Sequence, residues 1–306
     1  MGVFLPGEGE TPVPVFLGIS FSRLDQIFVA EGAIAVPPSP TAEPSVPNDP
    51  ISLPVGEEPA SQWPLATILA RGYGVIVLNN REIAIDLPTA FDRTIYPLFY
   101  EGEQAQPELR QWGAISAWAW GLSRIMDVVE ADPEIDASRV ATIGHSRYGK
   151  TALWAAAQDE RFAMAISNNS GCAGAALFRR AYGENIAEIN RVFPHWFNDH
   201  FTSYDHRDQE IPLDQHQLLA LLAPRPLYVA SAAGDVWADP RGEYLSTFHA
   251  SPAYGLYGFP VWETEASPEV GSKRWLGPIG YHLRPGIHDL TPYDWKRYLD
   301  AADEWL

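Results

Sequence analysis

One short stretch constrains the fold of this chain more than any other, because a strand-like run, a turn with a serine and a helix-like run follow one another directly. The apolar run RVATI occupies residues 139–143, the turn GHSRYGK residues 144–150, and the helix-like run TALWAAA residues 151–157. Such a turn lifts the hydroxyl of Ser146 off the edge of a sheet and points the N-terminus of the helix at the group that reacts there. The pattern is that of a nucleophile elbow.

Runs typical of strands and helices alternate along the rest of the chain. Strands are predicted at 13–19, 73–78, 162–167 and 226–231, and helices at 65–70, 112–129, 214–222 and 291–306. In the second helix Trp118, Leu122, Ile125 and Val129 share one face. The alternation predicts an α/β-hydrolase fold, a mostly parallel sheet with helices on both faces and its ligand site at the C-terminal ends of the strands. We expect a single α/β-hydrolase domain over residues 1–306, with a proline-rich loop at about 36–64.

Charge and hydropathy exclude several classes of partner. The 306 residues include 21 basic and 39 acidic side chains, for a net charge of −18. Because so acidic a surface repels phosphate backbones, we expect no nucleic-acid partner. No apolar run approaches the roughly 20 residues that span a bilayer, so we expect no membrane segment. Residues 1–6 contain neither a basic segment nor an apolar core, so we expect no signal peptide in this sequence.

A serine, an acid and a histidine occur in the order that α/β-hydrolases use. Ser146 lies at the elbow, Asp235 follows the strand that is predicted to end at Ser231, and His288 lies in a loop before the last helix. A serine hydroxyl becomes a strong nucleophile only when an oriented base takes its proton. We therefore predict Ser146 as nucleophile, His288 as general base and Asp235 as the acid that orients His288.

Each of these residues has a structural alternative. Ser146 could be an ordinary turn residue, His288 could cap the last helix, and Asp239 could be the acid while Asp235 caps a turn. Arg147 directly follows the serine and could bring a permanent positive charge to a developing oxyanion. Lys150, one turn further along, could reach the same pocket. The alternative for both cations is that they face solvent.

The elbow resembles the signature of the glucuronoyl esterases, Gly-x-Ser-Arg-x-Gly-Lys. The resemblance covers about residues 12–20 and 65–306. Its further motifs lie at 167–175, 193–197, 214–216, 223–226, 237–243 and 288–295. It implies a serine carboxylic ester hydrolase that cleaves esters between 4-O-methyl-glucuronic acid on xylan and lignin alcohols, with no cofactor. It also implies a secreted or periplasmic enzyme.

The same resemblance implies roles for individual residues. Ser146 would be the nucleophile, His288 the base, and Arg147 part of the oxyanion hole. Lys150 and Glu184 would hold sugar hydroxyls, and Trp237 would pack against the sugar ring. Some family members carry the triad acid as glutamate after the strand that follows the elbow. Residues 168–170 here contain no carboxylate, which assigns the acid to Asp235.

Two other functions and a metal site are alternatives to this function. An acetyl xylan esterase, or another small-acyl esterase, would use the same triad without needing Lys150 and Glu184. A catalytically silent carbohydrate-binding relative would hold sugar without turnover. His195, Asp199 and His200 have a spacing that does not place all three on one helical face, so we expect no metal site. We expect the protein to act as a monomer on a glucuronoxylan or lignin-carbohydrate ester substrate.

Overall fold

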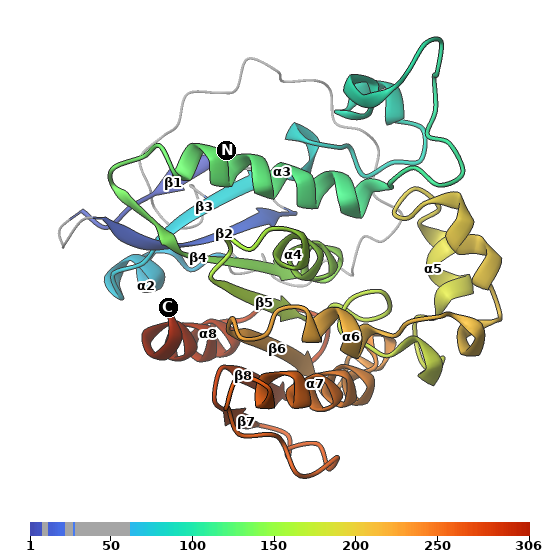
Figure 1. The fold of residues 1–306 in the computed structure, drawn as a ribbon. Coiled ribbons are helices and arrows are strands. Elements are labelled where there is room, and N and C mark those ends of the chain that lie inside the picture. Colours follow the sequence, from blue (N-terminus) through green and yellow to red (C-terminus); the bar gives the residue numbers. More distant parts are fainter. Residues whose placement is uncertain (8–11, 22–26, 28–61) are drawn as a thin grey trace.

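The computed structural model describes residues 1–7, 12–21, 27 and 62–306 and contains an eight-stranded sheet (Figure 1). The strand order is β1-β3-β2-β4-β5-β6-β8-β7. The strands are β1 (Gly2–Phe4), β2 (Val13–Ser20), β3 (Gly74–Asn79), β4 (Ile135–His145), β5 (Met164–Asn168), β6 (Leu227–Ala232), β7 (Ser272–Leu276) and β8 (Ile279–Arg284). Only the two outermost strands, β1 and β7, pair antiparallel with their neighbours. The predicted mostly parallel sheet is therefore confirmed.

Helices cover both faces of the sheet. The α-helices are α2 (Leu65–Ala70), α3 (Ala114–Val129), α4 (Arg147–Gln158), α5 (Ile186–Val192), α6 (Gln215–Ala220), α7 (Pro240–Gly255) and α8 (Pro292–Trp305). Buried residues of α3, α4, α6 and α7 form one core with the sheet, and those of α2 and α8 form a second core against the opposite face. This two-layer cover is the α/β-hydrolase arrangement that the alternation of runs predicts.

The two cores arise from the alternation of side chains along each strand. In β2, Val15 and Leu17 point into the core with α3 and α4, whereas Phe16 between them points to the other face. There the Phe16 ring lies 5.3 Å from the ring of Trp295 on α8. Every residue of β2 is buried. A strand that is covered on both faces has a continuous apolar sequence, and residues 13–19 therefore predict this strand.

The sequence predicted some elements closely and missed others. The predicted helices at 65–70, 112–129 and 291–306 are found as α2, α3 and α8, and Trp118, Leu122 and Val129 of α3 are buried. The helix α7 was missed. It contains Pro252 and buries polar side chains such as Glu243 and Thr247, so it shows no apolar stripe. The short helix α5 and the strands β1, β7 and β8 were also missed.

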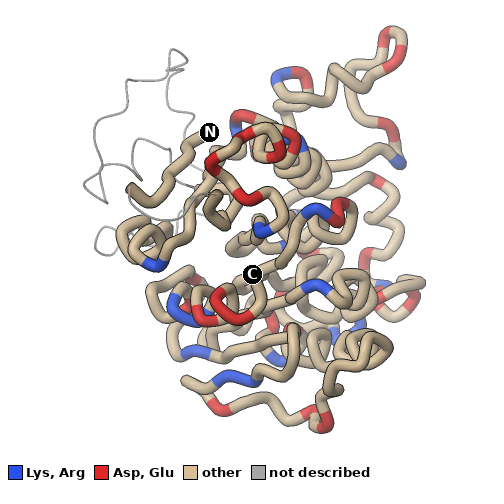
Figure 2. Tube along the Cα trace, turned by 60° about the vertical axis from the view of Figure 1, so that its left-hand side comes forward, with Lys and Arg blue, Asp and Glu red and all other residues tan. Residues whose placement is uncertain are grey.

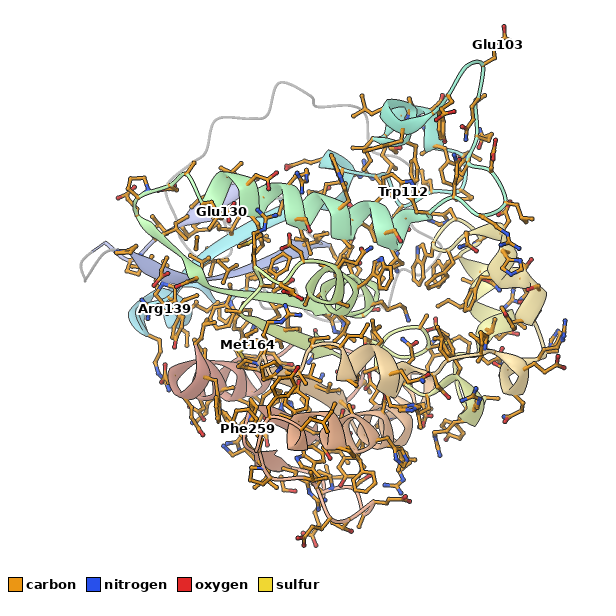
Figure 3. All side chains as sticks on the ribbon, in the orientation of Figure 1. Glu103, Trp112, Glu130, Arg139, Met164 and Phe259 are labelled. Atoms are coloured by element: carbon orange, nitrogen blue, oxygen red, sulfur yellow. The ribbon has the colours of Figure 1, made fainter. Side chains whose placement is uncertain are left out.

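In the described part of the chain the layers are closely packed, and the acidic residues are spread over the molecule. Side chains fill the space between the sheet and the helices (Figure 3). Acidic residues lie on many separate segments of the trace instead of in one patch (Figure 2).

None of the helices described is long and apolar enough to cross a bilayer. The proline-rich loop predicted at about 36–64 lies outside the described residues except for 62–64.

Candidate active site

The elbow places Ser146 between the end of β4 and the first residue of α4. Its backbone has φ 58° and ψ −126°, a left-handed conformation that is strained for a residue with a side chain. The N–H of Ser146 donates to the carbonyl of Asn168 on the neighbouring strand β5 at 2.9 Å, which fixes the turn to the sheet. Backbone strain of this kind is typical of a nucleophile elbow, because it exposes the hydroxyl above the strand ends.

Close packing explains why the second glycine of the elbow comes at position 149. A Cβ atom on Gly149 would lie 2.9 Å from the Cβ of Ser170 and 3.1 Å from the carbonyl oxygen of Gly144. A Cβ atom on Gly144 would collide with the carbonyl of Tyr148. The first turn of α4 thus packs directly against the segment after β5, and both positions require glycine.

His288 and Asp235 are brought together by the structure although they are 53 residues apart. The Nδ1 of His288 lies 2.6 Å from an oxygen of Asp235, and the amide of Asn169 donates to the same oxygen at 2.7 Å. Burial raises the pKa of Asp235, but the contacts with His288 and Asn169 outweigh it, so that the pKa lies below its ordinary value. Asp239 is instead paired with Arg180 at 2.6 Å. Of the two acids considered, Asp235 is the one beside His288.

The His288 ring lies close to the elbow. Its centre is 4.5 Å from the ring of His145, the residue that precedes Ser146. With Nδ1 directed at Asp235, the other ring nitrogen is left for a serine hydroxyl. Ser146 and His288 are both described by the structure, and no hydrogen bond joins Ser146 Oγ to the imidazole in it. Catalytic hydrogen bonds commonly tighten only when substrate is bound.

The loop that carries His288 is held by a buried arginine. Arg284, the last residue of β8, donates from its guanidinium to the carbonyls of Pro285 at 3.0 Å, Ile287 at 3.0 Å and Asp289 at 2.6 Å. Its Nε also donates to both oxygens of Asp294, at 3.1 and 2.9 Å. Because one rigid cation binds three carbonyls on both sides of His288, the position of the imidazole depends on this network.

Arg147 is buried and its charge is matched by Asp86. The guanidinium forms an ion pair with Asp86 and stacks over the rings of Phe193 at 5.2 Å and Trp196 at 4.8 Å. Asp86 also contacts Nε2 of His195 and accepts from Nε1 of Trp196, each at 2.7 Å. Burial raises the pKa of Asp86, and the contacts with His195, Arg147 and Trp196 lower it below its ordinary value. The prediction that Arg147 contributes to the oxyanion hole stays a prediction, since the structure holds no substrate.

Lys150 and Glu184 form a buried pair one turn into α4. Lys150 Nζ donates to Glu184 at 2.8 Å and to the carbonyls of Ser170 and Cys172 at 2.6 Å each. All three ammonium hydrogens are therefore used. A sugar hydroxyl could bind Lys150 only by replacing one of these oxygens, whereas Glu184, fixed by Lys150, remains 9% exposed.

Trp237 lies next to Glu184 and remains accessible. The N–H of Glu184 donates to the carbonyl of Trp237 at 2.8 Å, while 49% of Trp237 is exposed. A half-exposed ring beside a buried carboxylate is suited to contact a sugar ring. The structure thus places the three predicted substrate contacts in one cluster, and their roles remain predictions.

A second buried carboxyl group, Glu243 of α7, lies beneath this cluster. It accepts hydrogen bonds from the N–H groups of Ser170 at 2.7 Å and Gly171 at 3.0 Å, and from Ser231 Oγ at 2.5 Å. Burial raises the pKa of Glu243 to about 8. Through Ser170, Glu243 supports the segment whose carbonyls bind Lys150.

Sequence reasoning missed Asp86, Asn169, Arg284 and Glu243. Asp86 lies in a stretch without periodicity, and its contact with Arg147 joins positions 61 residues apart. Asn169 lies in the segment 167–175, one of the family motifs, but its sequence context assigns it no role beside the triad acid. His195, considered as a metal ligand, contacts Asp86. Within the described residues no group of three His, Cys, Asp or Glu side chains is arranged to hold a metal ion.

Comparison with known sequences and structures supports one family. A family model described as fungal glucuronyl esterase matches residues 48–258. Carbohydrate esterase MZ0003, from an unknown prokaryotic organism, is 41% identical to this chain. The alignment covers 99% of this chain and 70% of that protein. 4-O-methyl-glucuronoyl methylesterase 1 of Wolfiporia cocos is 30% identical over 81% of this chain, which spans 63% of that protein's length.

Solved structures agree with the sequence comparisons. A glucuronoyl esterase from Solibacter usitatus superimposes with a TM-score of 0.88 at 43% identity, covering 98% of this chain and 76% of that one. A promiscuous CE15 esterase from a marine bacterial metagenome gives a TM-score of 0.84 at 40% identity, covering 99% of this chain and 76% of that one.

Proposed function

The chain belongs to the glucuronoyl esterase family, and we propose that it hydrolyses esters of 4-O-methyl-glucuronic acid on xylan with lignin alcohols. The observation that carries the proposal is the contact between His288 and Asp235 at 2.6 Å beside the strained elbow of Ser146. The buried pair of Lys150 and Glu184 supports a uronate, because an esterase for small acyl groups has no need of a buried carboxylate.

In the first half of the reaction Ser146 Oγ attacks the ester carbonyl while His288 takes its proton. Asp235 stabilises the imidazolium that forms, and its low pKa keeps it ionised for this role. The oxyanion develops beside the first residue of α4, where the helix N-terminus and the guanidinium of Arg147 provide positive potential. His288 then donates its proton to the departing alcohol, leaving the glucuronoyl group on Ser146.

In the second half a water molecule replaces the alcohol. His288 takes a proton from the water, whose oxygen attacks the acyl carbonyl. The bond between the acyl carbon and Ser146 Oγ then breaks, His288 returns the proton to Oγ, and the free uronic acid leaves. The attraction of Arg147 for the anionic intermediate exceeds its attraction for the neutral ester, as a rate enhancement requires. Each step is assigned to a side chain or to water, without a cofactor.

A substrate panel tests the proposal. We expect the wild type to hydrolyse the methyl and benzyl esters of glucuronic acid in preference to an acetyl ester and to methyl galacturonate, and Ser146→Ala to abolish this turnover. Release of the alcohol would be followed by chromatography. Absence of turnover on every ester would contradict the proposal and would favour a silent carbohydrate-binding relative.

A small-acyl esterase is the second candidate. It is favoured by one comparison, since a structural relative at 40% identity is described as a promiscuous esterase. Turnover of the acetyl ester without turnover of either uronate ester would replace the first proposal with this one.

We also propose that residues 1–306 form one domain that acts as a secreted or periplasmic monomer without a nucleic-acid partner. The single sheet, to which strands from β1 to β8 all contribute, supports one domain. The net charge of −18 supports the lack of affinity for phosphate backbones. Light scattering of the purified protein and fractionation of the source cells test these points.

A further inference from the structure

Glu243, in the first turn of α7, is a buried acidic group that takes no part in the proposed chemistry. Its side chain is fully buried, and in the part of the chain that the structure describes no cation pairs with it. Burial raises the pKa of its carboxyl to about 8, so this group makes the fold less stable at neutral pH than at acidic pH. A side chain that lowers stability in this way commonly has a role at a functional site.

The contacts of Glu243 join the ends of two neighbouring strands, β5 and β6. One carboxylate oxygen accepts from the backbone N–H groups of Ser170 at 2.7 Å and Gly171 at 3.0 Å, directly after β5. The other oxygen accepts from the hydroxyl of Ser231 in β6 at 2.5 Å. Consecutive backbone N–H groups of this kind form a concave site for an anion, which Glu243 fills from within the protein.

Residues 169–172, which we call the turn after β5, have a backbone that needs such support. Asn169 has φ 47° and Gly171 has φ 61°. The left-handed conformation of Asn169 costs energy and persists only where the surrounding structure enforces it. Because the carboxylate of Glu243 binds the N–H groups in the middle of this turn, it stabilises the shape of the turn.

The turn after β5 contacts two groups of the candidate site that have different roles. The side-chain amide of Asn169 donates to Asp235, the proposed triad acid, at 2.7 Å. The carbonyls of Ser170 and Cys172 each accept from the ammonium of Lys150 at 2.6 Å. A shift of this one turn would therefore displace a support of the acid and two of the three acceptors of Lys150 together.

We propose that Glu243 is a positioning residue that holds the turn after β5 and, through it, sets the orientation of Asp235 and the place of Lys150. The proposal rests on the proposed function, because Asp235 and Lys150 take their roles from it. Glu243 acts here by its shape and its acceptor atoms, and not by exchanging a proton with the substrate.

The test compares three substitutions of Glu243 in the full chain, with methyl glucuronate as substrate. Glu243→Gln keeps an oxygen for the two N–H groups, and its amide N–H can donate to the hydroxyl of Ser231. We expect kcat and KM of this variant to stay within about threefold of the wild type. Glu243→Ala removes every contact, and we expect kcat to fall at least about tenfold and KM to rise about fivefold.

Glu243→Asp separates geometry from charge. It keeps the carboxylate but shortens the side chain by one carbon, so it cannot reach the turn and Ser231 together. We expect the same combined loss as for Glu243→Ala, and this variant decides the test if Glu243→Ala does not fold. Losses in Glu243→Gln as large as those in Glu243→Asp would overturn the proposal.

A double variant shows whether Glu243 acts through the turn. Asn169→Ala alone should lower kcat, because Asp235 loses its amide donor. In that background Glu243→Ala should lower kcat by less than about a further twofold while it still raises KM, since residues that act along one path are not additive. Losses of kcat that multiply in full would overturn the route through Asn169.

A matched control lies on the same helix. Ser251 of α7 is also fully buried, and its Oγ accepts from the N–H of Trp262 at 3.2 Å, away from the turn after β5. Ser251→Ala should lower the midpoint of thermal unfolding without changing kcat or KM. If Glu243→Asp also lowers only this midpoint, Glu243 has no positioning role. Failure of the wild type to hydrolyse methyl glucuronate would instead overturn the proposed function.

Discussion

The site has two parts that are built in different ways. The base side consists of His288 and the Arg284 network that holds its loop, and the sugar side consists of Glu184 and Trp237, the predicted sugar contacts. His288 lies on a loop whose carbonyls are bound by a 3% exposed arginine, and the Asp294 carboxylate behind that arginine is fully buried. On the sugar side Glu184 is equally fixed, but the rings beside it, Tyr182 and Trp237, are half exposed. The comparison indicates that the groups proposed to move protons are held by buried contacts, whereas the surface proposed to meet the sugar is open. Changes on the base side should lower kcat, and changes on the sugar side should raise KM.

The largest expected effect is at the acid. Asp235→Asn removes the charge that stabilises the imidazolium, and we expect kcat on methyl glucuronate to fall about 10⁴-fold with little change in KM. Asp239→Asn is the matched variant, since Asp239 is paired with Arg180 and not with His288. If Asp239→Asn gives the larger loss of kcat, the assignment of the acid is wrong.

Next in size is the arginine behind the base. Arg284→Lys keeps the charge but removes the planar donor set that binds the carbonyls of Ile287 and Asp289, so His288 loses its position. We expect kcat to fall about 10²-fold, as small misplacements of catalytic groups produce.

A matched control for this variant exists elsewhere in the fold. Arg225 also donates to three backbone carbonyls, those of Ala156, Asp159 and Phe162, but it lies before β6, far from the strand ends that carry the site. Arg225→Lys should lower the midpoint of thermal unfolding without changing kcat of the folded enzyme. A loss of kcat that is equal in the two variants would mean that Arg284 acts on stability alone.

On the sugar side the expected effect is smaller and falls on KM. Trp237→Ala removes a ring that is 49% exposed and takes no part in the proposed proton transfers. We expect KM for methyl glucuronate to rise about tenfold, equivalent to ~1.4 kcal/mol, with kcat within a factor of about three. A fall in kcat with unchanged KM would erase the distinction between the two sides.

The buried carboxyl of Glu243 predicts a dependence of stability on pH. Its pKa is raised by burial to about 8 in the folded state, above the ordinary value of 4.5. The folded protein therefore binds more protons than the unfolded chain between these values, and Glu243 reduces stability as the pH rises through this range. Relative to Glu243→Gln, the wild-type unfolding midpoint should fall by several degrees between pH 5 and pH 9. Parallel pH profiles of the two proteins in scanning calorimetry would contradict this.

The smallest effect is expected far from the site. Arg71 pairs with Asp300 at 3.1 Å and with Asp303 across the surface, and its side chain is 40% exposed. Exposed pairs of this kind contribute about 0–1 kcal/mol. Arg71→Ala should leave kcat and KM unchanged and shift the urea midpoint only slightly, which sets the background for the other variants.

Local sequence patterns predicted the elbow, the two-sided sheet and the strand ends that carry Ser146 and Asp235. These features depend on short-range spacing, which one sequence displays. The residues that hold the predicted site residues in place, such as Asp86 and Arg284, could not be predicted in the same way. Asp86 meets Arg147 across 61 residues, and Arg284 lies on a strand, β8, in which His282 and Arg284 interrupt the apolar pattern. Contacts of this range are set by the packing of the whole fold, and single residues give no signal of them.

The closeness of two imidazoles at the elbow has a consequence for turnover. Burial, and to a lesser degree the neighbouring His288, lower the pKa of His145 to about 3, and its Nδ1 lies 2.7 Å from the side-chain oxygen of Asn168. His145 is therefore electrically neutral throughout the range in which an esterase works. In the proposed mechanism the ring of His288, 4.5 Å away, becomes cationic in each cycle. It then has no cationic imidazole beside it, and His145 does not compete with it for the transferred proton.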